Sequence, residues 1–133
     1  MGMYTELVLK CEVSGDAPDI VKNVVRYLFD GGDRPEQIPD HDFFKCHRWS
    51  SIGSGSSAYH FPEAISNVFK YDWDESLYIF SRSDLKNYDD EIAKFVDWIT
   101  PHLVAHGETC IGWSWYEEDE KPTLVMINNG EPK

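Results

Sequence analysis

The spacing of apolar residues changes along this chain, and that change constrains the fold more than any other feature of the sequence. Between Tyr4 and Val13 apolar and polar residues alternate, with Val8 as a break in the pattern. From Ile20 to Phe29 the apolar residues instead recur at steps of three and four. The first spacing is typical of a strand with one solvated face, and the second of an amphipathic helix. The sequence therefore predicts a sheet with a helix packed on it.

Two main helices are predicted. The first covers residues 17–30, with Asp16 in position to cap its free N–H groups. The second follows Asn87, whose side chain can cap the first turn, and it carries a long apolar stripe. Because Pro101 lacks a backbone donor, this helix should kink or end one turn early.

Strand-forming residues predict the rest of the sheet. Runs at 57–61, 77–82, 109–117 and 123–128 are expected to be strands, and residues 62–69 a helix of one or two turns. The chain order is then strand, helix, strand, strand, helix, strand, strand. This order predicts a single α+β domain over residues 1–133, with one antiparallel or mixed sheet of about five strands and both main helices on one face.

The segment between the first helix and the second strand is expected to be mostly loop. Prolines and a glycine-serine run interrupt residues 33–55. Phe43, Phe44 and Trp49 are its apolar anchors. We expect these three rings to hold the loop against the core.

The charge of the chain excludes some partners and favours others. The 24 acidic residues outnumber the 12 basic ones, which gives a net charge of −12. Such a surface repels phosphate backbones and anionic lipids, so we expect neither direct nucleic-acid binding nor membrane binding. It attracts a basic protein surface, and it also keeps a protein soluble. Both interpretations of the charge remain open.

The three cysteines predict a reduced, intracellular protein. Cys11, Cys46 and Cys110 are odd in number and lack close pair spacing, and no signal peptide is recognisable at the start of the sequence. Cys11 and Cys110 lie on predicted strands, so both are expected to be buried. No apolar run approaches the length needed to cross a bilayer.

The densest acidic segment lies on a predicted hairpin tip. Residues 116–122 read Tyr-Glu-Glu-Asp-Glu-Lys-Pro and separate the last two predicted strands. Ile111, Trp113 and Trp115 are expected to share one face of the first of these strands. The candidate partner-binding residues are therefore Glu117, Glu118, Asp119, Glu120, Trp113 and Trp115.

No motif for catalysis, metal binding or cofactor binding stands out, and we predict no catalytic residue, no metal and no cofactor. The nearest approach to a metal site is His41, Cys46, His47 and His60, which lack the two close pairs of a structural zinc site. The run Ser50–Ser57 has the composition of an anion-binding loop, but it lacks the lysine and following helix of a nucleotide loop. The prediction is that the chain is not an enzyme.

Several segments resemble a family of small bacteriophage and prophage proteins for which no activity is established. They span nearly the whole chain and are weakest between Gly31 and Gly55. The resemblance implies a small protein made in the cytoplasm of a bacterial host. The segments are residues 1–7 (Met-Gly-Met-Tyr-Thr-Glu-Leu), 56–61, 81–88, 91–92, 98–101, 116–118 and 121–124.

Three classes of function follow from these observations. The first is an accessory protein that binds and modulates a host protein through its acidic surface, for example a nucleic-acid-binding defence protein such as a CRISPR or restriction nuclease. The second is a structural or homodimeric phage component, for which Trp113 and Trp115 supply an interface. The third is a small enzyme or ligand-binding protein that uses the histidines, cysteine and serines of residues 41–60.

Overall fold

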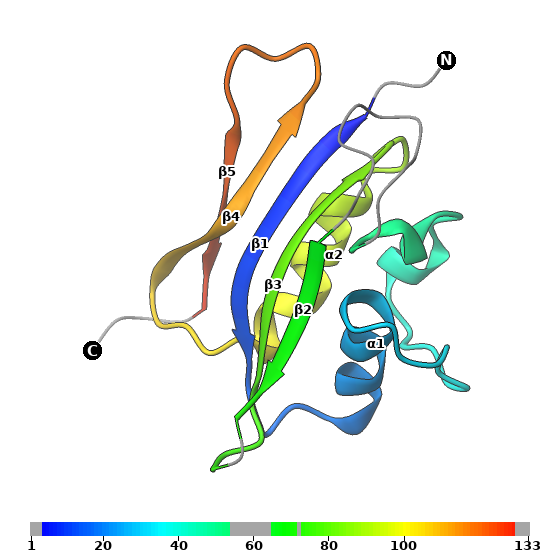
Figure 1. Cartoon of the computed structure of the whole chain (residues 1–133), viewed down its shortest axis with the longest axis vertical. Coiled ribbons are helices and arrows are strands. Elements are labelled where there is room, and N and C mark those ends of the chain that lie inside the picture. Colours follow the sequence, from blue (N-terminus) through cyan, green and yellow to red (C-terminus); the bar gives the residue numbers. More distant parts are fainter. Residues whose placement is uncertain (1–3, 54–64, 72, 130–133) are drawn as a thin grey trace.

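The computed structural model of the chain describes residues 4–53, 65–71 and 73–129. Within these residues it contains a five-stranded sheet and two α-helices (Figure 1), which confirms the predicted α+β class. The strands are β1 (Thr5–Val13), β2 (Ile65–Lys70), β3 (Leu77–Leu85), β4 (Glu108–Tyr116) and β5 (Thr123–Asn128), the helices are α1 (Asp19–Phe29) and α2 (Glu91–Ile99), and the 3-10 helices are η1 (Asp42–Lys45), η2 (Trp49–Ser51) and η3 (Thr100–His102).

The sheet has the strand order β2-β3-β1-β4-β5, and every neighbouring pair is antiparallel. The first strand of the chain is therefore the central one. It pairs with β3 from Thr5 to Val13 and with β4 from Thr5 to Leu9. The alternating pattern of β1 is consistent with this central position, because one full row of its side chains is buried in the core.

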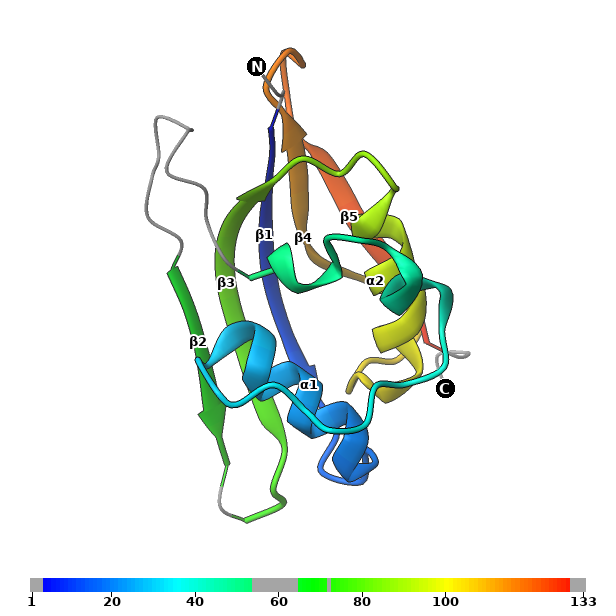
Figure 2. The same cartoon turned by 90° about the vertical axis from the view of Figure 1, so that its right-hand side faces the viewer.

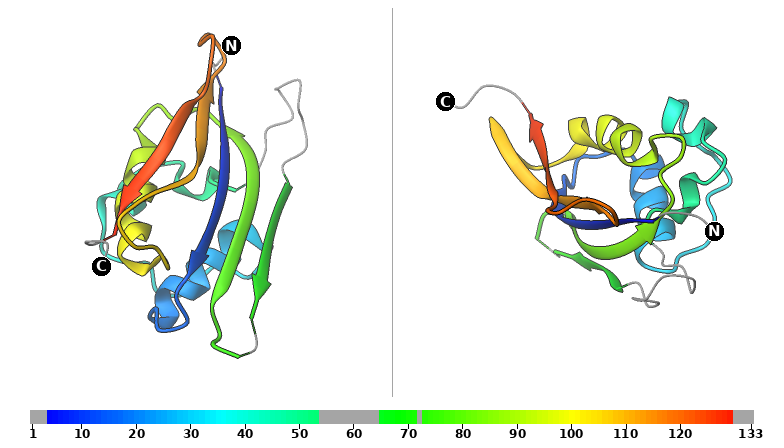
Figure 3. Two further views of the ribbon diagram at one scale, coloured as in Figure 1. Left: turned by 90° about the vertical axis from the view of Figure 1, so that its left-hand side faces the viewer. Right: turned by 90° about the horizontal axis from the view of Figure 1, so that it is seen from above.

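Both helices cover the same face of the sheet (Figure 3). We call this the inner face and the opposite one the outer face. On the inner face the buried row of β1 packs against the apolar stripes of α1 and α2. The predicted placement of both main helices on one face is confirmed. The buried residues of this core include Leu7, Leu9, Val13, Val24, Val25, Phe29, Ile79, Phe95 and Ile99.

The loop after α1 lies against α2 and is fixed there by aromatic rings (Figure 2). Phe43 is fully buried, and its ring centroid lies 5.4 Å from that of Phe95 and 6.2 Å from that of Trp98. Phe44 and Trp49 pack edge to face at 4.9 Å. The prediction that these rings anchor the loop to the core is confirmed.

The capping predicted for α2 is found in the structure, and the capping predicted for α1 is not. In α2 the N-cap residue is Asp90, whose side chain makes no capping hydrogen bond; the Asn87 side chain serves the first turn, as expected, by accepting a hydrogen bond from the Ile92 N–H at 3.0 Å. The helix ends at Ile99 and continues as η3, which contains Pro101, so the expected early end is also confirmed. In α1, however, the N-cap is Pro18 and not Asp16.

The short helix predicted over residues 62–69 is wrong. Ile65–Lys70 forms the edge strand β2, which pairs with β3 from Ile65↔Arg82 to Lys70↔Leu77. The spacing of apolar residues here also suits a helix, but β-branched and aromatic residues gain more from cross-strand packing when a partner strand is available. The strand expected at 57–61 lies outside the described residues.

The pairing of β4 with β5 shifts register between Cys110 and Gly112. Ile111 is the extra residue of this bulge, and it turns into the core, where it is buried. Trp113 and Trp115 instead lie on the outer face, opposite Val8 and Glu6 of β1. The prediction that Ile111 shares a face with the two tryptophans is therefore wrong, because the bulge reverses the alternation.

Candidate functional site

The hairpin of β4 and β5 carries the acidic segment at its turn. The turn extends beyond the ends of the neighbouring strands (orange in Figure 1). The Asp119 N–H donates to the Tyr116 carbonyl at 2.9 Å, and the indole Nε1–H of Trp115 donates to the Asp119 carbonyl at 2.9 Å. One of the predicted tryptophans therefore closes the acidic turn directly.

A second set of contacts ties the turn to the start of β1. The Glu117 N–H donates to the Tyr4 carbonyl at 3.1 Å, and the Tyr4 N–H donates to Oε1 of Glu117. The start of the turn is thus held against β1 by one main-chain hydrogen bond and one hydrogen bond to the Glu117 side chain. Because the turn is preformed, it loses less conformational entropy on binding a partner than a free loop would.

All four predicted acids of the turn are exposed to solvent, from Glu117 to Glu120. Their field acts on the nearest titratable ring. Partial burial raises the pKa of the Tyr116 phenol, and the carboxylates of Glu118 and Glu117 raise it further. The turn is therefore a concentrated negative site on a fixed backbone.

The outer face of the sheet exposes large apolar side chains. Leu124, on β5 near the turn, is 61% exposed, and Phe69, on the opposite edge strand β2, is 66% exposed, whereas most rings of the inner face are buried. Leu124 lies opposite Trp113 in the β4–β5 pair, so it extends the apolar surface from the tryptophans to the edge of the sheet. The exposed apolar residues of this face are Phe69, Phe80, Trp115, Leu124 and Met126.

Sequence reasoning named the two tryptophans and missed the other residues of this apolar face. Leu124 and Met126 occupy alternate positions of a correctly predicted strand. The sequence alone therefore indicated that these two side chains lie on one face of the sheet. An ion pair lies in the middle of the same face, where Arg82 Nε donates to Oε2 of Glu6 at 2.6 Å. Both side chains are about four-fifths buried, which fixes the pair between β3 and β1.

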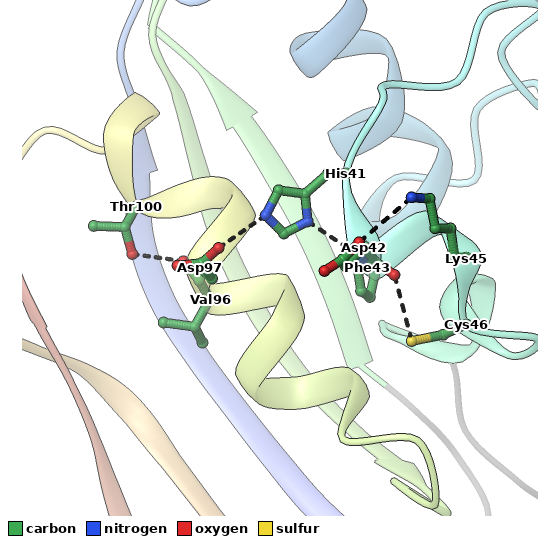
Figure 4. Close-up of polar contacts among 8 residues, drawn as sticks. All are labelled: His41, Asp42, Phe43, Lys45, Cys46, Val96, Asp97 and Thr100. Atoms are coloured by element: carbon green, nitrogen blue, oxygen red, sulfur yellow. Dashed lines mark hydrogen bonds and ion pairs between the residues drawn. The ribbon is translucent and has the colours of Figure 1, made fainter.

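In the loop proposed as an alternative site, residues 41–60, His41 has a structural role (Figure 4). Nδ1 of His41 accepts from the Phe43 N–H at 3.0 Å, so the proton of the neutral ring lies on Nε2. Nε2 in turn lies 2.9 Å from Oδ2 of Asp97 and donates to it. His41 therefore caps η1 and links it to α2. His60 lies outside the described residues.

Cys46 and His47 line a shallow pocket of about 450 Å³ between η1 and the start of α2. Burial raises the pKa of the Cys46 thiol, with opposing effects from Lys94, which lowers it, and from Glu91 and Asp89, which raise it. A thiol with a raised pKa is a poor nucleophile at neutral pH. Among the residues that the structure describes, no three histidines, cysteines or acids are placed to share a metal ion.

The cysteines also differ from prediction in exposure. Cys11 is buried as expected, and burial raises its pKa to about 12. Cys110 is exposed on β4, so the prediction that it is buried is wrong. It precedes the bulge residue Ile111 and lies opposite Met126, which is itself exposed at the sheet edge.

This difference predicts the reactivity of the three thiols. At pH 8 in native buffer, we expect Ellman's reagent to modify Cys110 first, because it alone is exposed. Cys46 and Cys11 should react more slowly, since burial raises the pKa of both. Cys110→Ser should remove the fast phase, and Cys46→Ser should leave it. A fast phase that persists in Cys110→Ser would contradict this assignment.

Comparisons of the chain were made with protein-family models, with curated proteins and with solved structures. None of them finds a match. Within the described parts of the chain, no helix has both the length and the apolar character needed to cross a bilayer. The chemistry of the hairpin and its neighbours is therefore the basis on which a function is proposed.

Proposed function

We propose that this chain is a non-enzymatic binding protein that modulates a host protein by placing the β4–β5 turn against a basic surface. The observation that supports this most strongly is the turn itself. Four successive acids are exposed on it, and hydrogen bonds from Trp115, Glu117 and Asp119 fix its backbone. The turn is thus both charged and preformed.

The surroundings of the turn support a protein partner. Trp115 and Leu124 are exposed next to the acids. Aromatic residues are enriched where proteins bind each other, and a charged rim around an apolar centre is the common arrangement of such interfaces. A basic partner with an apolar patch complements both parts of this surface.

The resemblance to small phage proteins supports the finer version of the proposal. In that version the chain acts in the cytoplasm of a bacterial host, and the partner is a nucleic-acid-binding defence protein. Such proteins carry basic channels for phosphate backbones, and an acidic turn is attracted to a basic channel. The acidic turn would then inhibit the defence protein by occupying its basic channel.

The test is to neutralise the turn without changing its shape. The variant Glu117→Gln, Glu118→Gln, Asp119→Asn, Glu120→Gln keeps one acceptor oxygen in each side chain, including one for the Tyr4 N–H, and replaces the other oxygen with an uncharged NH2 group. We expect affinity capture from a bacterial lysate to recover at least about tenfold less of a specific basic partner with this variant than with the unaltered chain. Quantitative mass spectrometry measures the recovery.

A matched control separates the turn from the net charge. The variant Asp30→Asn, Asp33→Asn, Glu36→Gln, Asp40→Asn removes the same charge from four exposed acids between α1 and η1. It should capture the partner as well as the unaltered chain does. An equal loss in both variants would show that only overall charge matters, and an unchanged capture in both would refute a role for the turn.

A further inference from the structure

A second surface lies at the β5 edge of the sheet, on the side of α2. Across the described ranges β5 pairs with β4 alone, so the backbone groups on its other side face away from the sheet. Figure 2 shows β5 running beside α2. Between them is a groove of about 370 Å³, lined among others by Ala93, Val96 and Asp97 from α2 and by Met126 and Ile127 from β5.

The β5 edge lacks the features that usually prevent strands from pairing with other chains. Thr123–Asn128 contains no ionisable residue and no proline. Natural edge strands are commonly blocked by lysine, proline or a bulge, and the extra residue of the β4–β5 bulge lies on β4. The other edge strand, β2, ends in the exposed Lys70. The β5 edge is therefore the better of the two for strand addition.

The side of the groove formed by α2 and η3 leaves room for side chains of an added strand. Ala93, Val96, Asp97 and Thr100 follow helical spacing along one side of α2 and η3, next to the buried stripe, and Val96 also packs against the core. A strand added to β5 lies about 4.8 Å beyond it and points every second side chain toward the inner face. Those side chains enter the groove next to Ile127 and Val96.

Charge decides the chemistry of the added strand. Among the described residues that line the groove, Asp97 is the ionisable one; its Oδ2 accepts from His41, and its side chain is still 80% exposed. The chain as a whole carries a net charge of −12. An acidic segment is therefore repelled, whereas a segment with lysine or arginine between apolar residues is attracted.

We propose that the groove between β5 and α2 binds an extended basic segment of another protein by strand addition to β5. The main-chain hydrogen bonds of β5 supply affinity, and the groove selects apolar side chains at alternate positions. This site is separate from the acidic turn and does not depend on the function proposed for it.

The probe is a capped peptide of about seven residues in which valine and lysine alternate. We expect binding to protect backbone amides of Thr123–Asn128 from hydrogen exchange at alternate positions, as measured by NMR. A peptide of the same composition, with its valines and lysines in separate blocks, should not protect them. Absence of protection in β5 with the alternating peptide would overturn the proposal.

Two protein variants locate the site. Ala93→Arg places a long cation in the groove from an exposed position and should weaken binding of the alternating peptide by about tenfold. Asn23→Arg adds the same charge to an exposed position of α1 and should have less than about a twofold effect. Equal weakening by both variants would show that only the net charge of the protein affects peptide binding, and it would overturn the proposal.

The neutralised turn distinguishes this proposal from the proposed function. With the four acids replaced by amides, the alternating peptide should still protect the β5 amides. If protection is lost in that variant and kept in Ala93→Arg, the peptide binds the acidic turn and the groove proposal is wrong. Loss of partner capture by the neutralised turn leaves the groove result unaffected.

Discussion

Replacing Phe43 with alanine should lower the free energy of unfolding by about 3–5 kcal/mol, a large fraction of the roughly 5–15 kcal/mol of a typical domain. The ring is fully buried, and its centroid lies within about 5–6 Å of the rings of Phe44, Phe95 and Trp49. Its removal leaves a cavity between the loop and α2, and surrounding rings cannot collapse into it without breaking their own contacts. Urea denaturation followed by circular dichroism measures the change.

Phe69→Ala is the matched control for that experiment. It removes the same ring from the outer face, where the Phe69 side chain is 66% exposed. We expect a change within about 0.5 kcal/mol. Comparable losses in the two variants would mean that the loop rings do not form part of the core.

Gly112→Ala should destabilise the fold by about 4 kcal/mol, from roughly 1–3 kcal/mol of backbone strain and roughly 1–3 kcal/mol of overpacking. Gly112 has φ of +151°, and an added Cβ would lie 1.8 Å from the Val8 carbonyl oxygen. That oxygen belongs to the central strand, so the clash cannot be relieved by a side-chain rotation. Thermal and urea unfolding of the purified variant measure the loss.

Gly31→Ala separates the two contributions. Gly31 also has positive φ, at +69°, but nothing lies within 4 Å of an added Cβ. This variant should lose only about 1–2 kcal/mol, the cost of a left-handed conformation for an L-residue. If Gly112→Ala costs no more than Gly31→Ala, the close approach of β4 to β1 is not a significant constraint.

The parts of the fold that the sequence predicts are those with a long, regular pattern. The alternation of Thr5–Val13 identifies a strand, and the helical stripe after Asn87 identifies α2 together with its cap and its early end at Pro101. The aromatic anchors of the loop are also predicted, because burying large rings contributes strongly to the stability of a core. In each case a single local signal decides the structure.

The parts that could not be predicted depend on contacts between distant segments. Residues 65–70 form a strand because β3 provides an edge with which they can pair. The local sequence contains no information about that partner strand. The inward turn of Ile111 depends on a bulge whose position is set by the close approach of Gly112 to Val8. The hydrogen bond from Trp115 to Asp119 likewise needs the turn geometry, so the charge of the site was predictable and its rigidity was not.

The central place of β1 determines when this sheet can form during synthesis. Thr5 needs Leu85 on one side and Tyr116 on the other, so β1, which precedes the other four strands in the sequence, waits for partners that are synthesised much later. Contacts between such distant residues close large loops and slow folding. A nascent chain that ends before β4 exposes one edge of its central strand, and that edge is therefore protected only after β4 has been translated.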